Sequence, residues 1–278
     1  MNRGSPLVRI VRKLLTLNRV GASFIGLILR MFPERNVGHI YIIGAPRSGT
    51  TITYQRFISN FNVKYLDNYL HLMFGVPFFR GMSNWFAPSY KEHSTHGFVS
   101  GLRGAAEGLH FWDYWTNTRL KFKQDFRFRK GFRLYIDYME PSKRPFITCY
   151  IPHLGHVHEI LDQDPNAFVV LLHRNSEAVL KSLKKIYQEK FIPEEKWFSY
   201  QPDELPTTEG LDLKLQAQVG FYNTLLEQDK KSDEIRVLEV TYEEMVDFNS
   251  VTKDRILFAY NTFAKTRNLS ILKARKNG

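Results

Sequence analysis

The 278-residue sequence has a single cysteine, Cys149, so no intramolecular disulfide can form. We therefore expect the fold to depend on its buried core and to suit a reducing compartment. Cys149 stands in an apolar run that is predicted to be a buried strand. Because free cysteines are among the most buried residues, this position favours a packing role over that of a nucleophile.

Long hydrophobic runs are also missing. Residues 20–32 are apolar but are interrupted by Gly21, Ser23, Gly26 and Arg30, whereas a spanning helix needs about 20 apolar residues. The first 20 residues carry five basic side chains and no clean apolar block, which does not match a signal peptide. We expect a cytoplasmic protein, with peripheral contact to an anionic membrane as an open alternative.

Acidic residues are fewer than basic ones, and the formal net charge is +11. Such a surplus favours anionic partners, namely nucleic acid, anionic lipid or a multiply charged small molecule, without choosing among them. Part of it lies in residues 1–38, where apolar residues follow approximate helical spacing and basic residues lie mostly on the other side. This segment is predicted to be a helix, either docked on the domain or lying on anionic lipid.

Short apolar runs alternate with stretches of helical spacing along most of the chain. Since strands of a parallel sheet are buried on both faces, this alternation predicts a single α/β domain at residues 39–278, with a central parallel sheet flanked by helices. The predicted strands are residues 40–43, 63–66, 145–149, 167–172 and 235–240, and the predicted helices are 50–61, 153–162, 176–189, 212–230 and 253–266. Residues 68–135 break the alternation and are predicted to be an insertion above the sheet, where specificity usually lies.

The segment from Gly44 to Thr51 follows the first predicted strand and opens a helix. Its glycines let the backbone approach an anion, and the free N–H groups and positive dipole end of the helix favour one. Gly44 and Gly49 have the spacing of a Walker A loop, but Thr50 stands where that loop has lysine. The missing lysine weighs against a nucleoside triphosphate, and Arg47 supplies a positive charge inside the loop instead.

The run Pro46-Arg47-Ser48-Gly49-Thr50-Thr51 resembles, at every position, the [PR]-[KR]-S-G-T-T loop of the sulfotransferases that use 3′-phosphoadenosine 5′-phosphosulfate (PAPS). A second segment is similar to the same family: Arg174 stands two residues after the apolar run 167–172, and Ser182 follows eight residues after Arg174. The resemblance implies a P-loop-containing, sulfotransferase-like fold. It also implies that the loop binds the 5′-phosphosulfate, that Arg174 and Ser182 bind the 3′-phosphate, and that adenosine 3′,5′-bisphosphate is the product, with no metal required.

The acceptor implied by the resemblance is a hydroxyl of a carbohydrate or glycolipid, because residues 93–112 resemble the acceptor-side segment of bacterial enzymes of that kind. Glu107 is predicted to be the base, with His110 second and His153 third, and Arg47 is predicted to stabilise the departing phosphate. The predicted substrate-binding residues are Arg103, Phe111, Trp112 and His153. One position departs from the family: Tyr150 stands two residues before Pro152, where relatives often have a lysine near the transferring group.

Other functions stay open at this point. A P-loop nucleotide kinase or NTPase shares the strand–loop–helix unit. A non-enzymatic module for nucleic acid or anionic lipid would use the basic, phenylalanine-rich residues 119–133, although these are also explained by an amphipathic helix with its rings inward. Of these partners we expect no nucleic acid. Histidines at 93, 96, 153, 156 and 158 raise a zinc site, but no clear third ligand accompanies the pair 93 and 96 or the pair 153 and 156, so no metal is predicted.

Overall fold

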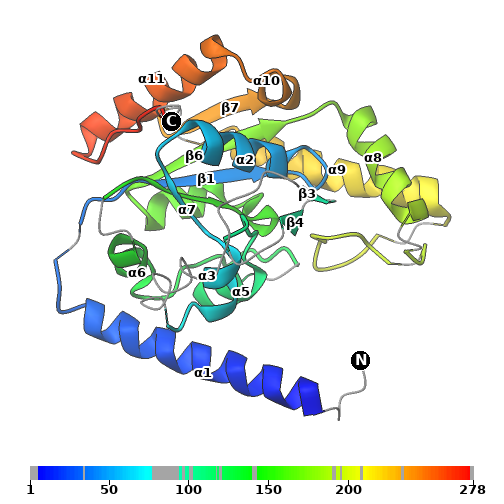
Figure 1. Ribbon diagram of the computed structural model, residues 1–278. Helices are drawn as coiled ribbons and strands as arrows, with labels where there is room; N and C mark the ends of the chain where they lie inside the picture. The colour runs from blue at the N-terminus through cyan, green and yellow to red at the C-terminus, as the bar shows by residue number, and fades with distance from the viewer. Residues whose placement is uncertain are drawn as a thin grey trace.

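In the computed structural model a five-stranded parallel sheet forms the centre of the molecule, with helices on both of its faces (Figure 1). The structure describes residues 6–33, 35–76, 94–95, 98–99, 103–116, 118, 121–139, 143–189, 192–194, 196–206, 209–232 and 235–275. The strand order is β2-β5-β1-β6-β7. This architecture confirms the predicted fold class.

The strands lie close to the predicted apolar runs. They are β1 (His39–Gly44), β2 (Lys64–Tyr65), β5 (Phe146–Cys149), β6 (Ala167–His173) and β7 (Val237–Thr241), and a separate antiparallel pair consists of β3 (Ser94–Thr95) and β4 (Phe98–Val99). The helices are α1 (Pro6–Leu29), α2 (Thr50–Asn60), α3 (Asn68–Met73), α5 (Leu109–Trp115), α6 (Phe132–Met139), the 3₁₀ turn η2 (Ile151–His153), α7 (Val157–Gln163), α8 (Ser176–Glu189), α9 (Leu211–Asp229), α10 (Tyr242–Val246) and α11 (Ser250–Thr266). The helix predicted over 153–162 therefore begins four residues later than expected, after η2.

The two faces of the sheet bury two different cores, since successive strand residues point to opposite sides. In β1, Ile40 and Ile42 pack with residues of α2 and α11, while Tyr41 and Ile43 pack with residues of α5, α6, α7 and α9. All six residues of β1 are buried. Continuous burial on both faces is why this strand reads as an unbroken apolar run.

The register of β1 brings three chain segments to one edge of the sheet. Ile42 lies beside Cys149 of β5 on one side and Val170 of β6 on the other, in parallel pairs. The residues that follow these strands therefore emerge together at the carboxyl edge, which is where open α/β sheets bind their ligands.

Helix α1, in the N-terminal segment 1–38, is docked on the domain, which was the first of the two arrangements predicted for it. Ala22, Ile25 and Leu29 are buried in the same core as α5 and α6. Asn18, 5% exposed, joins α1 to the end of α3, because its side chain donates to the Leu72 carbonyl and accepts from the Gly75 N–H at 2.9 Å. The division of the chain into a basic N-terminal segment, 1–38, and an α/β domain, 39–278, stays a prediction.

The part of the basic stretch 119–133 that the structure describes, residues 121–133, does not form the predicted amphipathic helix. Residues 121–131 form a loop, in which Phe128 pairs with Thr116 through an isolated antiparallel β-bridge. Helix α6 begins only at Phe132. The phenylalanines nevertheless face inward: Phe126 and Phe132 are buried. Apolar spacing predicted which side chains are buried but not the backbone, because a loop that lies across a core can bury the same rings.

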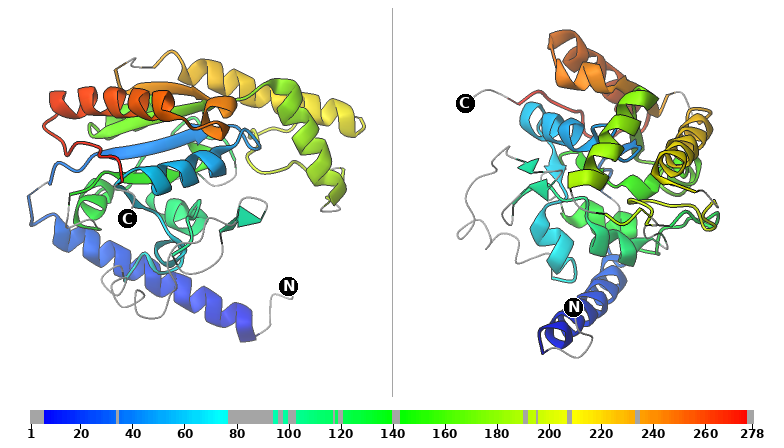
Figure 2. Two further views of the ribbon diagram at one scale, coloured as in Figure 1. Left: turned by 45° about the horizontal axis from the view of Figure 1, so that its top comes forward. Right: turned by 90° about the vertical axis from the view of Figure 1, so that its right-hand side faces the viewer.

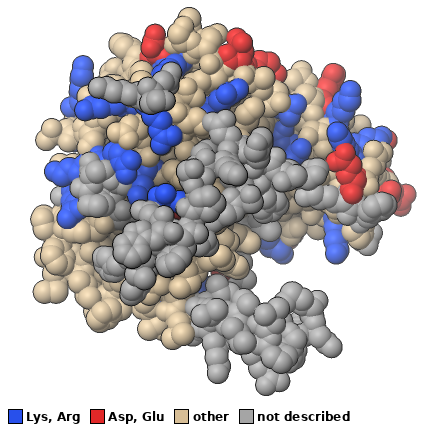
Figure 3. All heavy atoms as spheres, viewed as in Figure 1, with Lys and Arg blue, Asp and Glu red and all other residues tan. Residues whose placement is uncertain are grey.

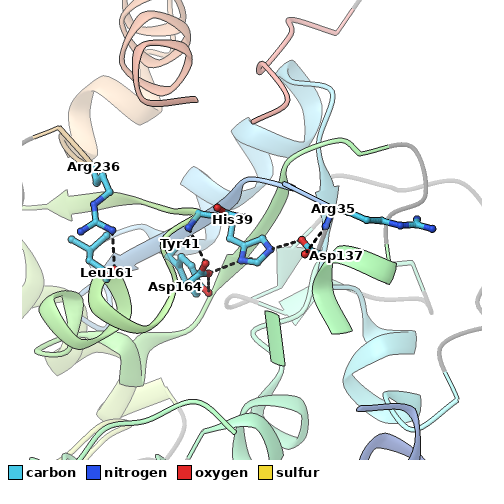
Figure 4. A network of polar contacts seen from close by, with 8 residues as sticks. Arg35, His39, Tyr41, Asp137, Leu161, Asp164 and Arg236 are labelled. Carbon is cyan, nitrogen blue, oxygen red and sulfur yellow. Dashed lines mark hydrogen bonds and ion pairs between the residues drawn. The ribbon is translucent and has the colours of Figure 1, made fainter. Parts of the chain in front are cut away.

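A buried ionic cluster joins the start of β1 to two neighbouring segments (Figure 4). His39 Nδ1 contacts Asp164 Oδ2 at 2.5 Å, and His39 Nε2 lies 3.7 Å from Asp137 Oδ1. Asp164 also accepts from the Tyr41 hydroxyl at 2.9 Å. Burial alone would lower the pKa of His39, but the two carboxylates outweigh it and raise that pKa from 6.5 to about 9.

We predict that His39→Gln lowers the free energy of unfolding by about 3 kcal/mol near pH 6, since it removes one partner from a buried ionic cluster. A histidine pKa that is higher in the folded state contributes stability that is fully present below pH 6.5 and is lost as the pH rises through about 9. The difference between wild type and variant in urea unfolding should shrink across that interval. His158→Gln, at an exposed ion pair with Asp162, is the control and should change little at any pH. A difference that stays constant from pH 6 to 9 would contradict a charged His39.

Candidate functional site

The loop between β1 and α2 has a backbone shape that only certain residues adopt. Gly49 has a φ of 101°, and a Cβ at this position would lie 2.4 Å from the Tyr242 ring. Arg47 also has a left-handed φ, 68°, which is uncommon for a residue with a side chain. Below the loop, buried Ser48 donates its hydroxyl to the Ala45 carbonyl at 2.7 Å. This hydrogen bond stabilises the turn of the loop.

The amino end of α2 presents backbone donors to the space in front of this loop. Gly49 is the N-cap and supplies no side-chain cap, and the first helical hydrogen bond runs from Thr53 N to the Gly49 carbonyl. The N–H groups of the first turn are therefore available to an anion, which the helix dipole also favours. The Thr51 side chain lines the same space.

Two arginines from different strand ends meet beside the loop. Arg174, just after β6, donates from Nη1 to the Arg47 carbonyl at 2.8 Å, and its guanidinium carbon lies 3.9 Å from the Tyr242 ring centre. The Arg47 Nε donates to the Ser182 hydroxyl at 3.1 Å. The sequence motifs predicted that these residues share one ligand, and the structure brings them into direct contact.

The electrostatics of this pair favour an anionic ligand. Burial, and next the charge of Arg174, lower the pKa of Arg47, while Glu189 and Tyr242 raise it less. Arg174 Nε is buried and, among the described residues, has no hydrogen-bond acceptor. Two neighbouring guanidinium groups with a spare buried donor are stabilised by a bound phosphate, which accepts several charge-assisted hydrogen bonds at once.

A cleft of about 850 Å³ opens above the loop, a volume within the range of small-molecule sites. It lies over the carboxyl edge of the sheet, where Figure 2 shows the amino ends of α2 and α8 close together. Its walls come from the loop, α2, α3, the segment before α5, the ends of β5 and β6, α8, residues 198–199 and α10. The lining residues are Pro46, Arg47, Gly49, Thr50, Thr51, Ile52, Gln55, Asn68, His71, Ala105, Ala106, Glu107, Gly108, Leu109, Tyr150, Ile151, Pro152, Arg174, Ile186, Phe198, Ser199 and Tyr242.

Glu107 lies on the wall of the cleft formed by the segment before α5. Its side chain is open to the cleft, yet protein atoms surround it densely enough that desolvation raises the pKa of its carboxyl to about 7. The neighbouring Gly108 has a φ of 76°, and a Cβ there would lie 2.2 Å from Leu66. Glycine at 108 thus permits the turn that presents Glu107. A carboxyl with a pKa near neutrality is suited to general base catalysis.

Two histidines stack beside Glu107. The rings of His71 and His110 are 5.0 Å apart and 13° from parallel, and His71 lines the cleft whereas His110 is not among its lining residues. Burial, and next the charge of His110, lower the pKa of His71 to about 4, against a hydrogen bond with the Gly108 backbone. His71 is therefore neutral near pH 7. Sequence reasoning missed it because a histidine in a short helix far from any motif carries no signal.

Four residues predicted on the acceptor side lie outside the cleft. Phe111, Trp112 and His153 are fully buried in the core, and the His153 ring is 4.4 Å from that of Trp112. Burial lowers the pKa of His153 well below its usual value, so it is neutral. Arg103 is half-buried, and its carbonyl accepts from the Tyr65 hydroxyl at 2.9 Å. Their positions give no support to a direct role in substrate binding.

Tyr150, at the position where relatives often have lysine, lines the cleft at the end of β5 and stacks on Trp112 with ring centres 5.8 Å apart. The residue as a whole is only 2% exposed. The cleft therefore has an aromatic wall at this point rather than a third cation. Tyr242, the first residue of α10, stacks on the Arg174 guanidinium and is a further contact of this site.

Within the described ranges, no group of three His, Cys, Asp or Glu side chains is arranged to hold a metal ion. His93 and His96, which raised the zinc alternative, lie outside the described residues. The described helices include none that is both long and apolar enough to cross a bilayer.

Comparison with known proteins assigns the family. Residues 39–259 match the model of the sulfotransferase family, which is more than half of the chain. The chain belongs to the sulfotransferase family. A search of curated proteins found no match to this sulfotransferase.

Two solved structures share the fold. Sulfotransferase STF9 from Mycobacterium avium is similar over 95% of this chain and 76% of its own, with a TM-score of 0.56 and 12% identity. Sulfotransferase STF1 from Mycobacterium tuberculosis is similar over 85% of this chain and 68% of its own, with a TM-score of 0.50 and 14% identity. At such low identity the likeness shows the α/β fold alone, and the chemistry must come from the cleft.

Proposed function

We propose that this sulfotransferase moves the sulfuryl group of PAPS to a hydroxyl of a carbohydrate or glycolipid. The observation that carries the proposal is the contact of Arg174 with the loop at Arg47, at the amino end of α2. A bisphosphorylated adenosine needs two anion sites within one ligand length, and the arginine pair and the free helix N–H groups supply cations and donors for both. The cleft volume is sufficient for such a donor.

The residues of the cleft divide the chemistry between them. Glu107 takes the proton of the acceptor hydroxyl, whose oxygen forms a bond to sulfur while the bond from sulfur to the phosphate oxygen breaks. That oxygen keeps the electron pair, and Arg47 and the α2 N–H groups stabilise the negative charge on it. Because the charge is met by fixed donors, positioning and electrostatics supply the rate, as in phosphoryl transfer.

An acceptor with a sugar ring is supported by the mixed apolar and polar residues that line the cleft. Leu109, Tyr150 and Phe198 offer apolar or aromatic surface, and Asn68 and His71 offer polar groups that can recognise hydroxyls. Incubation with sulfur-labelled PAPS and a panel of glycans and glycolipids tests the acceptor class, and transfer to phenols or amines alone would contradict it.

Thermal stabilisation tests the donor before any acceptor is known. Adenosine 3′,5′-bisphosphate at 100 times its dissociation constant should raise the melting temperature by about 5 °C or more. At that excess, binding to the folded state adds about 3 kcal/mol to the free energy of unfolding. ATP with magnesium should give a smaller shift. The reverse order, with magnesium-dependent ATP hydrolysis, would favour the nucleotide kinase or NTPase alternative.

A further inference from the structure

The outward side of α1 is apolar although the helix already buries its inward side in the core. Leu17, Val20, Phe24, Leu27 and Ile28 recur at helical spacing and are exposed by 38% to 66%. Met31, just past the helix, is 84% exposed. Helices on a globular surface normally carry polar residues outward, and contiguous exposed apolar patches mark interaction sites. We call these six residues the α1 stripe.

Among the described residues, the rest of the domain lies on one side of α1. Figure 1 shows α1 along the lower edge, with the sheet and the other labelled helices on one side of it only, and the coloured ribbons of Figure 2 agree. The lower left of the space-filling view, where the second half of α1 lies, consists of uncharged residues (Figure 3). The apolar side chains of the stripe are thus exposed and able to contact a partner.

A basic groove borders the stripe. It has a volume of about 410 Å³ and lies between α1, α5 and the loop before α6, and it is lined by the cations Arg30, Arg129 and Lys130 together with apolar residues such as Leu27 and Trp115. The three cations belong to exposed residues, and no described carboxylate pairs with them. Arg129 instead lies over the Tyr114 ring at 4.9 Å.

From these observations we infer that α1 docks on an anionic lipid bilayer, with the α1 stripe among the acyl chains and a phosphate headgroup in the groove of Arg30, Arg129 and Lys130. An apolar helix face bordered by cations is the arrangement of helices that lie in the membrane interface. The match of charge selects a phosphate-bearing bilayer over a second copy of this basic chain. No described helix qualifies as a membrane span, so α1 would lie on the surface.

The docked side of α1 connects this surface to the cleft. Asn18 bonds to the end of α3, which carries Asn68 and His71 of the cleft wall. Arg19 also pairs with Asp113 of α5 at 2.7 Å. A membrane bound by the stripe would therefore hold the acceptor wall in a fixed orientation to lipid-borne substrates, although membrane binding itself does not depend on the proposed reaction.

The test is sedimentation of the full chain with vesicles of phosphatidylcholine, with or without phosphatidylglycerol. Wild type should bind the anionic vesicles. Phe24→Glu should weaken that binding about 10- to 100-fold, since it removes one buried aromatic side chain from the bilayer. Phe258→Glu, at a residue 76% exposed on α11 on the opposite side of the molecule, is the matched control and should bind like wild type.

Charge is tested in the same assay. Neutralising Arg30, Arg129 and Lys130 to Gln should reduce binding on the order of 100-fold, because each cation near an anionic surface changes partitioning about fivefold. The same change at Lys253, Lys265 and Arg267 of the α11 side should have little effect.

Equal binding by wild type and Phe24→Glu would overturn the proposal. So would light scattering that finds a wild-type dimer which Phe24→Glu dissociates, because the stripe would then join two copies. An unchanged melting-temperature shift with adenosine 3′,5′-bisphosphate shows that each variant is folded.

Discussion

Arg174→Ala should weaken binding of adenosine 3′,5′-bisphosphate about 100-fold. Arg174 has a buried Nε with no acceptor among the described residues, while its Nη1 is held against the Arg47 carbonyl. Removing a charged donor from a phosphate loses about 3 kcal/mol, which is about two powers of ten in the dissociation constant. Titration calorimetry of wild type and variant measures the change directly.

Comparison of two ligands shows which phosphate Arg174 holds. Wild type should prefer adenosine 3′,5′-bisphosphate over adenosine 5′-monophosphate, and Arg174→Ala should remove most of that preference. Arg174→Lys keeps the charge but loses the planar fork, so its affinity should be intermediate. Arg267→Ala, at an exposed residue beyond α11, should bind both ligands like wild type. A preference that survives in Arg174→Ala would place the 3′-phosphate elsewhere, and Arg47 would be the next residue to test.

The sheet was predictable because its residues obey one strong constraint. Strands β1 and β6 are buried on both faces, so nearly every residue is apolar, and their bounds match the prediction within two residues. Weaker constraints gave weaker predictions. The loop over 121–131 buries Phe126 as a helix would, and apolar spacing alone does not separate the two.

The site was predictable only where a motif fixes the backbone. Arg47, Gly49 and Arg174 lie where strand ends and a helix start must place them, and they converge at the carboxyl edge. The acceptor side depends on how residues 68–135 fold over the sheet, which no local pattern dictates. Hence Glu107 does reach the cleft, while Trp112, predicted beside a sugar, is a core residue.

Glu107→Gln should lower kcat by about 10²- to 10⁴-fold with little change in donor affinity, because general base catalysis contributes rates of that order. Glutamine keeps the shape of the side chain and loses only the ability to accept the proton. Burial raises the pKa of the Glu107 carboxyl to about 7, so wild-type kcat/KM should rise with pH up to about 7 and level off above it. The variant should lack this rising limb.

The pH profile separates a catalytic role from a structural one. If Glu107 only shaped the cleft, Glu107→Gln would lower the rate by the same factor at every pH and would keep the wild-type limb. Glu209→Gln, at an exposed carboxylate before α9 and outside the cleft, is the matched control and should leave both rate and profile unchanged. Full activity of Glu107→Gln would assign the proton to another group, and neutral His71, which also lines the cleft, is then the next side chain to test.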